Sequence, residues 1–238
     1  AIGRARLRGY DRVPTISDQV YGGIAAETEQ GWNAVRATRG EILTHDGVAI
    51  DAFFSSTCGG QTADGGEVFE GARHLSYLRA FPDVAPSGEA WCAISPRYRW
   101  REEWTGEALA ATLKETLPLA GGAAGQGAVR DIRIEGRSPT GRVIAMQVHY
   151  GNGAVPVRGA IVRRVLRPAG QAMLRSARFD LRATRAGGRV THLVAEGGGA
   201  GHGVGLCQWG AVGRARAGFN YREILAAYFP GTELRRAY

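Results

Sequence analysis

Apolar residues recur at two different spacings along the chain, and the spacing separates predicted helices from predicted strands. Apolar positions three or four residues apart predict helices, here at 28–39, 105–117, 159–166, 206–217 and 221–229. Apolar and polar positions alternate, as in half-buried strands, at 41–44, 48–54, 128–135, 142–150, 179–183 and 189–196. Residues 63–96 show neither period and are expected to be mostly irregular.

Capping and turn residues agree with these periods. Thr28 and Thr105 stand where helix N-caps are expected. Gly40 and Pro118 follow the last helical positions, where they end a helix. Asp46 precedes a glycine between two strand-like segments, which predicts a tight hairpin. Strands dominate and do not alternate strictly with helices, so we expect an α+β fold with mixed, mainly antiparallel sheets.

The length allows one large core or two smaller ones. The 238 residues suffice for a stable domain without metal or disulfide. We expect a single domain over 1–238, with the alternative of two subdomains that meet near the glycine-rich stretch 118–128. The start at Ala1 and the helix-like residues 1–7 lead us to expect a missing N-terminal part. No run of 18 apolar residues occurs, so no transmembrane segment is expected in the chain.

The charge indicates an anionic partner without identifying it. The formal net charge is +8, and Lys114 is the one lysine among 30 basic residues. Arg97, Arg99 and Arg101 alternate, so in a strand they would share one face and tolerate an acidic ligand. No nucleic-acid docking motif accompanies the charge, so nucleic acid is not an expected partner.

The three cysteines lack the paired spacing of a zinc ribbon or a redox site. We therefore expect neither a bound metal nor a cofactor. Cys58 and Cys92 lie in loop-like stretches and could form a disulfide in an oxidising compartment; two free thiols and a zinc site are the alternatives. Cys207 is left over within an apolar stretch, where packing is the usual role of a single cysteine.

The strongest local signal is the glycine-rich segment 197–211, GGGAGHGVGLCQWGA. Its glycines allow close backbone approach to a ligand, and it leads into a helix N-terminus. It matches neither a Walker loop nor G-x-G-x-x-G. His202 stands between glycines and is expected to be a solvent-accessible site residue, while Gln208 either is solvated or hydrogen-bonds a sugar-like ligand. Trp209 and Val212 are expected to face the core.

The second signal is the polar segment 56–62, STCGGQT, at the end of a strand. Polar residues at such positions are commonly presented to a ligand. One enzyme hypothesis makes Cys58 a nucleophile with His202 as its base, although no signature of such hydrolases is present. A serine hydrolase is disfavoured because G-x-S-x-G is absent.

Together these motifs resemble the SpoIID/LytB domain family of stage II sporulation protein D and the amidase enhancers. The matching pieces, in the family's order, are SDQVYGG at 17–23, AVRATRG at 34–40, AFFSSTCGGQT at 52–62, YLR at 77–79, GHGVGLCQWGA at 201–211 and ILAAYFPGT at 224–232. The resemblance spans nearly the whole chain. Cys207 replaces the serine that usually precedes the glutamine of the glycine motif.

The resemblance implies a peptidoglycan lytic transglycosylase, located outside the cytoplasm in the bacterial cell envelope, that cleaves glycan strands lacking stem peptides. The alternative is a non-catalytic amidase enhancer, whose partners would be glycan strands and a wall amidase. The family's catalytic glutamate lies in a helical segment before the region matching 1–7, so no catalytic residue is assigned here. The substrate-binding residues implied are Gln19, Tyr21, Ser56, Thr57, Gly59, Gly60, His202, Gly203, Gly205 and Gln208. We further expect the two loop motifs to face each other across one cleft, because a glycan groove needs polar groups from more than one segment.

Overall fold

The computed structural model describes residues 20–122, 125 and 127–237, and the chain contacts divide into two compact units. The first unit comprises 1–42 and 234–238, and the second comprises 43–233. The glycine-rich stretch 118–128 therefore lies inside the second unit. The helix-like segment expected at 1–7 falls outside the described residues.

The first unit contains the predicted helix near residue 30. The helix α2 spans Glu29–Ala37 after a 3-10 turn, η1, at Ile24–Ala26. Thr28 is its N-cap, because the Thr28 hydroxyl accepts a hydrogen bond from the Gly31 N–H at 3.1 Å. Gly40 follows the helix with a φ of 76°, which glycine adopts at little cost. The capping residues thus fix both ends of α2 as the sequence predicts.

A hairpin opens the second unit. Strand β1 (Glu41–His45) pairs antiparallel with β2 (Val48–Ala49) across Asp46 and Gly47, whose φ angles are 50° and 77°. Two positive φ angles are the requirement of the predicted tight turn. The last strand, β11 (Glu233–Arg236), joins the same sheet on the other side of β1.

The predicted strand at 48–54 is wrong in its length. The chain leaves the hairpin after Ala49, and a separate strand, β3 (Phe54–Ser55), pairs in parallel with β10 (Leu206–Cys207). Alternation in the sequence continues through both pieces, but their backbones hydrogen-bond to different partners. Local periodicity does not report such a change of partner.

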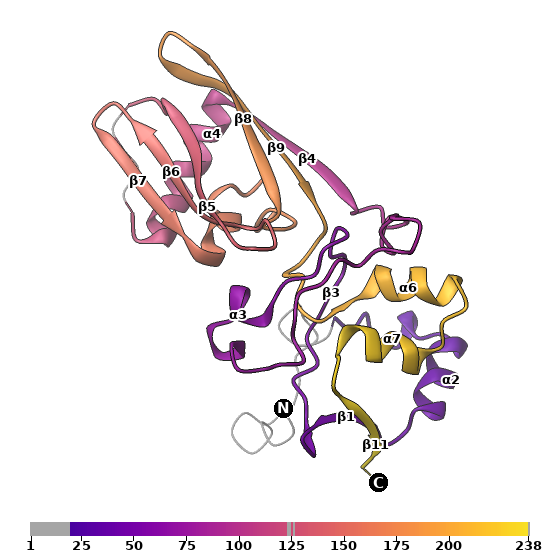
Figure 1. Ribbon diagram of the computed structural model, residues 1–238. Helices are drawn as coiled ribbons and strands as arrows, with labels where there is room; N and C mark the ends of the chain where they lie inside the picture. Colours follow the sequence, from indigo (N-terminus) through magenta and orange to yellow (C-terminus); the bar gives the residue numbers. More distant parts are fainter. Residues whose placement is uncertain (1–19, 123–124, 126, 238) are drawn as a thin grey trace. The chain divides into compact units, whose positions relative to one another are not determined.

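Two antiparallel sheets and four helical elements build the first core of the second unit (Figure 1). One sheet has the order β4-β9-β8 and the other β5-β6-β7. The bounds are β4 Arg99–Thr105, β5 Asp131–Arg137, β6 Val143–Tyr150, β7 Gly153–Arg158, β8 Phe179–Ala186 and β9 Arg189–Gly198. The helical elements are α4 Gly106–Thr116 continued by the 3-10 helix η3 Leu117–Ala120, and η4 Gly159–Ile161 continued by α5 Val162–Val165.

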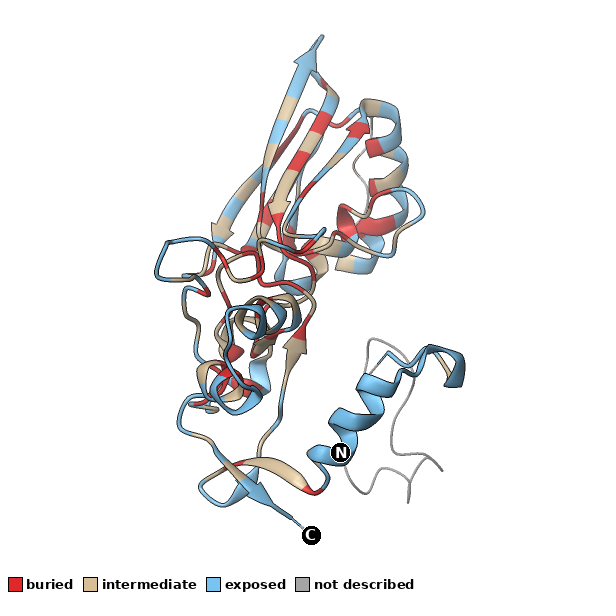
Figure 2. Ribbon diagram, turned by 90° about the vertical axis from the view of Figure 1, so that its right-hand side faces the viewer, coloured by how far each residue is buried: buried red, intermediate tan, exposed pale blue. Residues whose placement is uncertain are grey.

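Burial follows the predicted faces in this core. Leu109, Leu113 and Leu117 are fully buried, one helical turn apart. Figure 2 shows buried residues alternating with more exposed ones along the strands. Strands β4 and β7 are absent from the predicted elements. In β4 two buried tryptophans, Trp100 and Trp104, occupy one face among charged neighbours, so its high polarity hides a half-buried strand.

A second core lies where β3 and β10 meet. It contains all three cysteines, Val204, Tyr228 and Phe229. Four helical elements contribute to it: α3 Gly65–Val68, the 3-10 helix η2 Glu70–Ala72, α6 Gln208–Arg216 and α7 Tyr221–Tyr228. Trp209 packs against this core as predicted, but Val212 is 41% exposed, so its expected core position is wrong. No helix among the described residues is long and apolar enough to cross a membrane.

Candidate functional site

The two loop motifs identified in the sequence lie side by side. Thr57 and Ala200 exchange backbone hydrogen bonds of 3.0 and 2.8 Å, and the Trp209 N–H donates to the Ser56 carbonyl at 3.1 Å. The expected proximity of the motifs is therefore found. The expected cleft between them is not, because backbone pairing closes the space where they meet.

The polar residues of segment 56–62 are mostly engaged within the protein. Thr57 is 2% exposed, and its hydroxyl is 2.8 Å from that of Ser95. Its predicted contact with substrate is corrected: the side chain supports the loop. Ser56 and Gly60 are half-buried. Gly59 is buried, and a side chain there would meet the backbone of Gly198 at 2.9 Å, so the glycine permits the close approach of β9.

His202 is half-buried, so it is less accessible to solvent than its glycine neighbours lead us to expect. Its ring makes edge contacts with Phe69 and Phe53, with centroids 5.2 and 6.2 Å away. Burial lowers the pKa of His202 to about 4, although a hydrogen bond to the Phe54 backbone favours the protonated form. The neutral ring accepts a hydrogen bond at Nδ1 from the Val204 N–H at 3.1 Å. His202 thus fixes the shape of the glycine loop.

The remaining residues of the glycine motif divide between support and surface. Gly203 and Gly205 are buried, and the Gly203 N–H donates to the Ser55 hydroxyl at 3.2 Å. The guanidinium of Arg142 fills the space beside Gly203 and donates to the Gln61 carbonyl at 3.0 Å. Gln208, the first residue of α6, is exposed. Only Gln208 in this motif presents a side-chain amide to solvent.

The N-terminal members of the predicted set belong to the first unit. Tyr21 is 51% exposed, and its hydroxyl donates to the Glu27 carboxylate at 2.7 Å. Gln19 falls outside the described residues.

Cys207 is not a leftover cysteine. The sulfur atoms of Cys58, Cys92 and Cys207 all lie within 4.8 Å of one another, and all three residues are buried. Hydrogen bonds from the Cys207 and Cys58 thiols, together with the Gly59 and Gly60 N–H groups, lower the pKa of Cys92. Hydrogen bonds with Cys207 and Cys92, together with burial, raise the pKa of Cys58. Cys92 is fully buried, so its sulfur is not placed to attack a solvent-borne substrate.

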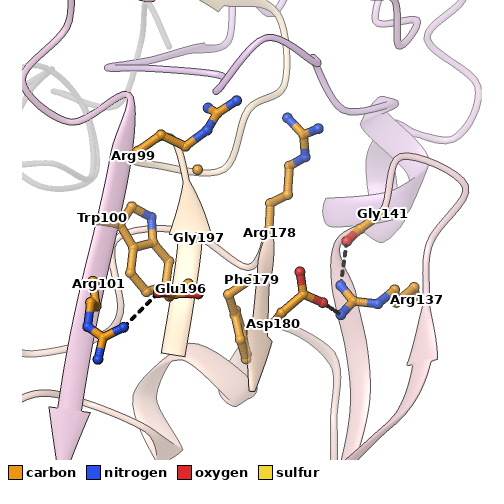
Figure 3. Close-up of a pocket in the computed structure, with 11 residues that line it drawn as sticks. Arg99, Trp100, Arg101, Arg137, Gly141, Arg178, Phe179, Asp180, Glu196 and Gly197 are labelled. Atoms are coloured by element: carbon orange, nitrogen blue, oxygen red, sulfur yellow. Dashed lines mark hydrogen bonds and ion pairs between the residues drawn. The ribbon is translucent and has the colours of Figure 1, made fainter. Parts of the chain in front are cut away.

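A wide, open pocket lies at the Gly198 end of the β4-β9-β8 sheet (Figure 3). Its volume is about 740 Å³, within the usual range of small-ligand sites, roughly 300–1,000 Å³. Four arginines line it from three directions: Arg99 and Arg101 on β4, Arg178 before β8, and Arg137 at the end of β5. Sequence alternation predicts that Arg99 and Arg101 share a face; Arg137 and Arg178 join them only in the fold.

The four guanidiniums are not equivalent. Arg101 is paired with Glu103 and Glu196 at 2.7 Å, and Arg137 with Asp180 at 2.5 Å. Within the described residues, Arg99 and Arg178 have no carboxylate partner. Both donate instead to the carbonyl oxygen of Gly59, at 3.2 and 2.8 Å. Figure 3 shows these two side chains at the same end of the pocket. Two positive charges therefore converge where no acid neutralises them.

Trp100 forms the pocket wall between these arginines and the sheet. The residue is 6% exposed, and its indole Nε1 has no hydrogen-bond partner among the described residues. Its ring lies against Gly197, where a side chain would collide with it. Trp100 therefore supports the pocket from within the core.

The two acidic residues that line the pocket form ion pairs with arginines. Glu196 binds Arg101 through one carboxylate oxygen and Arg182 through the other, at 2.7 and 2.6 Å. Asp180 is held by Arg137. Both carboxylates that line the pocket are thus engaged in ion pairs with arginines.

Comparison with known proteins finds a matching family and several similar proteins. Residues 68–205 match the family described as "Domain of unknown function (DUF8618)". An uncharacterized protein of Brachyspira hyodysenteriae is 27% identical over 94% of this chain and 54% of its own length. Stage II sporulation protein D of Bacillus amyloliquefaciens is 30% identical over 86% of this chain and 51% of its own length. The amidase enhancer of Bacillus subtilis is 25% identical over 92% of this chain and 34% of its own length. The chain thus spans about half the length of the first two relatives and a third of the last.

Proposed function

The chain belongs to the DUF8618 family and is a SpoIID/LytB-like protein. From this premise we propose that it is a lytic transglycosylase that acts on peptidoglycan strands lacking stem peptides. In this proposal the protein works outside the cytoplasm, in the bacterial cell envelope. The arginine-lined pocket is the part of the described structure that holds the glycan.

One observation carries the assignment of substrate: Arg99 and Arg178 converge without a carboxylate partner among the described residues. Each muramic acid unit carries a lactyl ether that ends in a carboxyl group. In strands with stem peptides that group is an amide and has no charge, whereas in strands freed of peptides it is a carboxylate. Arginine binds carboxylates through paired, charge-assisted hydrogen bonds. A pocket with two guanidiniums that no carboxylate of the described residues neutralises therefore favours the strands without peptides.

Trp100 lines the pocket next to Arg99 but is 6% exposed, so we assign it to the support of the pocket wall and not to stacking on a sugar ring. The exposed side chain of Gln208 is the member of the glycine motif that we assign to additional sugar contacts. Ser56 and Gly60, both half-buried, are proposed to border the glycan path from the loop side.

The proposed reaction needs one acid. A carboxylic acid protonates the glycosidic oxygen, which breaks the bond between C1 of muramic acid and that oxygen. The resulting carboxylate then takes the proton from the muramic 6-hydroxyl, whose oxygen bonds to C1 and closes a 1,6-anhydro ring. No water is activated, so the second carboxylate of a hydrolase is unnecessary. Glu196 and Asp180, the acids that line the pocket, are held in ion pairs, so we assign this role to neither of them.

A second candidate function is a glycan-binding amidase enhancer without chemistry of its own. The observation that favours it is the same engagement of the pocket acids, combined with a relative named amidase enhancer. Both functions use the pocket to hold glycan, and they differ only in whether the strand is cut.

Digestion of purified glycan strands tests the reaction. The gene product that contains residues 1–238 is incubated with strands whose stem peptides have been removed, and the products are analysed by mass spectrometry. We expect fragments that end in 1,6-anhydromuramic acid. Strand binding without such ends, together with faster cleavage by a wall amidase, would establish the enhancer function instead.

A binding comparison tests the substrate assignment separately. We expect the affinity for peptide-free strands to exceed that for peptide-bearing strands and for chitin oligosaccharides, which lack the lactyl group, by about tenfold or more, as one or two charged hydrogen bonds supply. Equal affinity for all three would remove the pocket from the proposal.

A further inference from the structure

The cysteine cluster is a feature that glycan binding does not use. Cys58, Cys92 and Cys207 come from three separate segments, a loop after β3, a turn before β4, and β10. Cys92 follows Cys58 by 34 residues along the chain, and Cys207 follows it by 149. Their exposures are 2%, 0% and 0%. Three buried thiols brought together from distant segments are more than local packing requires.

The spacing of the sulfurs fits a tetrahedral metal site. Zinc–sulfur bonds are about 2.3 Å long, so two sulfurs on one tetrahedron are about 3.8 Å apart. The Cys58 and Cys92 sulfurs are 3.7 Å apart, and the third sulfur lies within 4.8 Å of both. A disulfide between Cys58 and Cys92 requires an S–S distance of about 2.05 Å. Small movements of Cys207 would complete three corners of the tetrahedron.

Backbone N–H groups point at two of the sulfurs, where they would stabilise the thiolates formed on metal binding. The Cys207 sulfur accepts from the Cys58 N–H at 3.1 Å and the Gly210 N–H at 3.2 Å, and the Cys58 sulfur accepts from the Gly60 N–H at 3.4 Å. Gly59 and Gly60 have φ angles of 76° and 94°, which turn their amides toward the cluster. Donors of this kind stabilise a negative sulfur, the form in which cysteine binds metal.

A buried carboxylate adjoins the cluster. Asp83 Oδ2 accepts a hydrogen bond from the Cys58 thiol at 3.3 Å, and Asp83 is also held by the Tyr228 hydroxyl at 2.7 Å and by Arg214 at 2.9 Å. When Cys58 loses its proton, Asp83 keeps these two partners. A metal ion beside the thiolates would offset the repulsion between the Cys58 sulfur and this carboxylate.

We propose that Cys58, Cys92 and Cys207 bind one zinc ion as thiolates. The choice of zinc follows from three soft sulfur ligands in tetrahedral spacing, a set that selects zinc over the oxygen-preferring magnesium and calcium. The ion would link the two loop motifs to the turn at 90–96. It would thereby fix the position of Gly59, whose carbonyl oxygen accepts hydrogen bonds from Arg99 and Arg178. The site stands independently of the proposed glycan function.

Metal titration of the unaltered protein tests the site. The reduced, metal-free gene product is titrated with Co²⁺, which gives an intense sulfur-to-metal charge-transfer band when thiolates bind it. We expect the band to saturate at one equivalent, to disappear on addition of Zn²⁺, and native mass spectrometry to show one zinc per chain. Absence of the band overturns the proposal, and so does protein isolated from the envelope with a Cys58–Cys92 disulfide and no metal.

Single substitutions identify the ligands. Cys58→Ser, Cys92→Ser and Cys207→Ser are each expected to weaken Zn²⁺ binding by at least about tenfold, measured against a competing chelator. Ser95→Ala is the matched control, because Ser95 is a buried neighbour of Thr57 in the same turn as Cys92 and donates nothing to the sulfurs. Unchanged zinc affinity in Cys207→Ser overturns the three-cysteine site. Should a variant not fold, the Co²⁺ band and stoichiometry of the unaltered protein still decide.

Discussion

Arg178 donates a 2.8 Å hydrogen bond to the carbonyl oxygen of Gly59, a residue 119 positions earlier in the chain. The contact joins the start of β8 to the loop after β3, and so connects the first core of the second unit to the second. Arg99 donates to the same oxygen at 3.2 Å. One backbone carbonyl thus aligns two guanidiniums at the end of the pocket. Arg99 also donates to the carbonyl and the hydroxyl of Tyr98, at 3.0 and 2.9 Å, so N–H groups for a ligand remain mainly on Arg178.

Removal of either arginine should weaken glycan binding. We expect Arg99→Ala and Arg178→Ala each to lower the affinity for peptide-free strands about tenfold, and to leave the affinity for peptide-bearing strands nearly unchanged. Stability should change little, because the Gly59 carbonyl keeps its other donor. Arg164→Ala is the control, since it removes an exposed arginine outside the pocket. Equal losses in all three variants would point to general charge instead of a site.

The burial of His202 makes stability depend on pH. Its pKa is lowered to about 4 in the folded protein from 6.5, so the unfolded chain binds more protons between these values. The contribution of neutral His202 to the free energy of unfolding is therefore fully present above pH 6.5 and is lost as the pH falls toward 4. We expect His202 to account for about 2 kcal/mol of the loss in unfolding free energy between pH 7 and pH 5. Chemical denaturation of the unaltered protein and His202→Gln at both pH values measures it. If the two proteins lose equal stability, the histidine is not buried neutral.

The buried group around Asp83 should be important for stability. Arg214 is paired with Asp83, which is 0% exposed, and burial raises the pKa of Tyr228 so that its hydroxyl stays a donor to the same carboxylate. Arg214→Met leaves a buried charge without its partner, and we expect a loss of about 3–5 kcal/mol. Tyr228→Phe should cost about 1–3 kcal/mol. Denaturation of the two single variants and the double variant gives their coupling, and strictly additive losses would contradict a shared carboxylate.

Gly197 lies where only a hydrogen fits. A side chain there would meet the Trp100 ring and, at 2.6 Å, the Arg178 carbonyl. We expect Gly197→Ala to destabilise the protein by about 1–3 kcal/mol, because overpacking displaces the ring, and to reduce strand binding as the pocket wall moves. Gly71→Ala is the control, since a side chain at Gly71 meets no atom within 4 Å. Measurements of melting temperature and strand affinity check both effects. Equal melting temperatures and affinities in the two variants would show that Trp100 moves aside without cost.

The sequence by itself determined the elements whose causes are local. The Thr28 and Thr105 caps, the Asp46–Gly47 turn and the apolar period of α4 depend on neighbours a few residues away, and the structure confirms each of them. Charge alternation likewise put Arg99 and Arg101 on one face of a strand.

Tertiary structure decided which distant groups meet. The convergence of Arg99 with Arg178, the gathering of Cys207 with Cys58, and the burial of His202 between two phenylalanines all depend on how β3 pairs with β10 and how β9 approaches Gly59. Such pairings gain energy from contacts between segments more than 100 residues apart. Their partners are set by the packing of the whole unit, and no pattern within one segment records them.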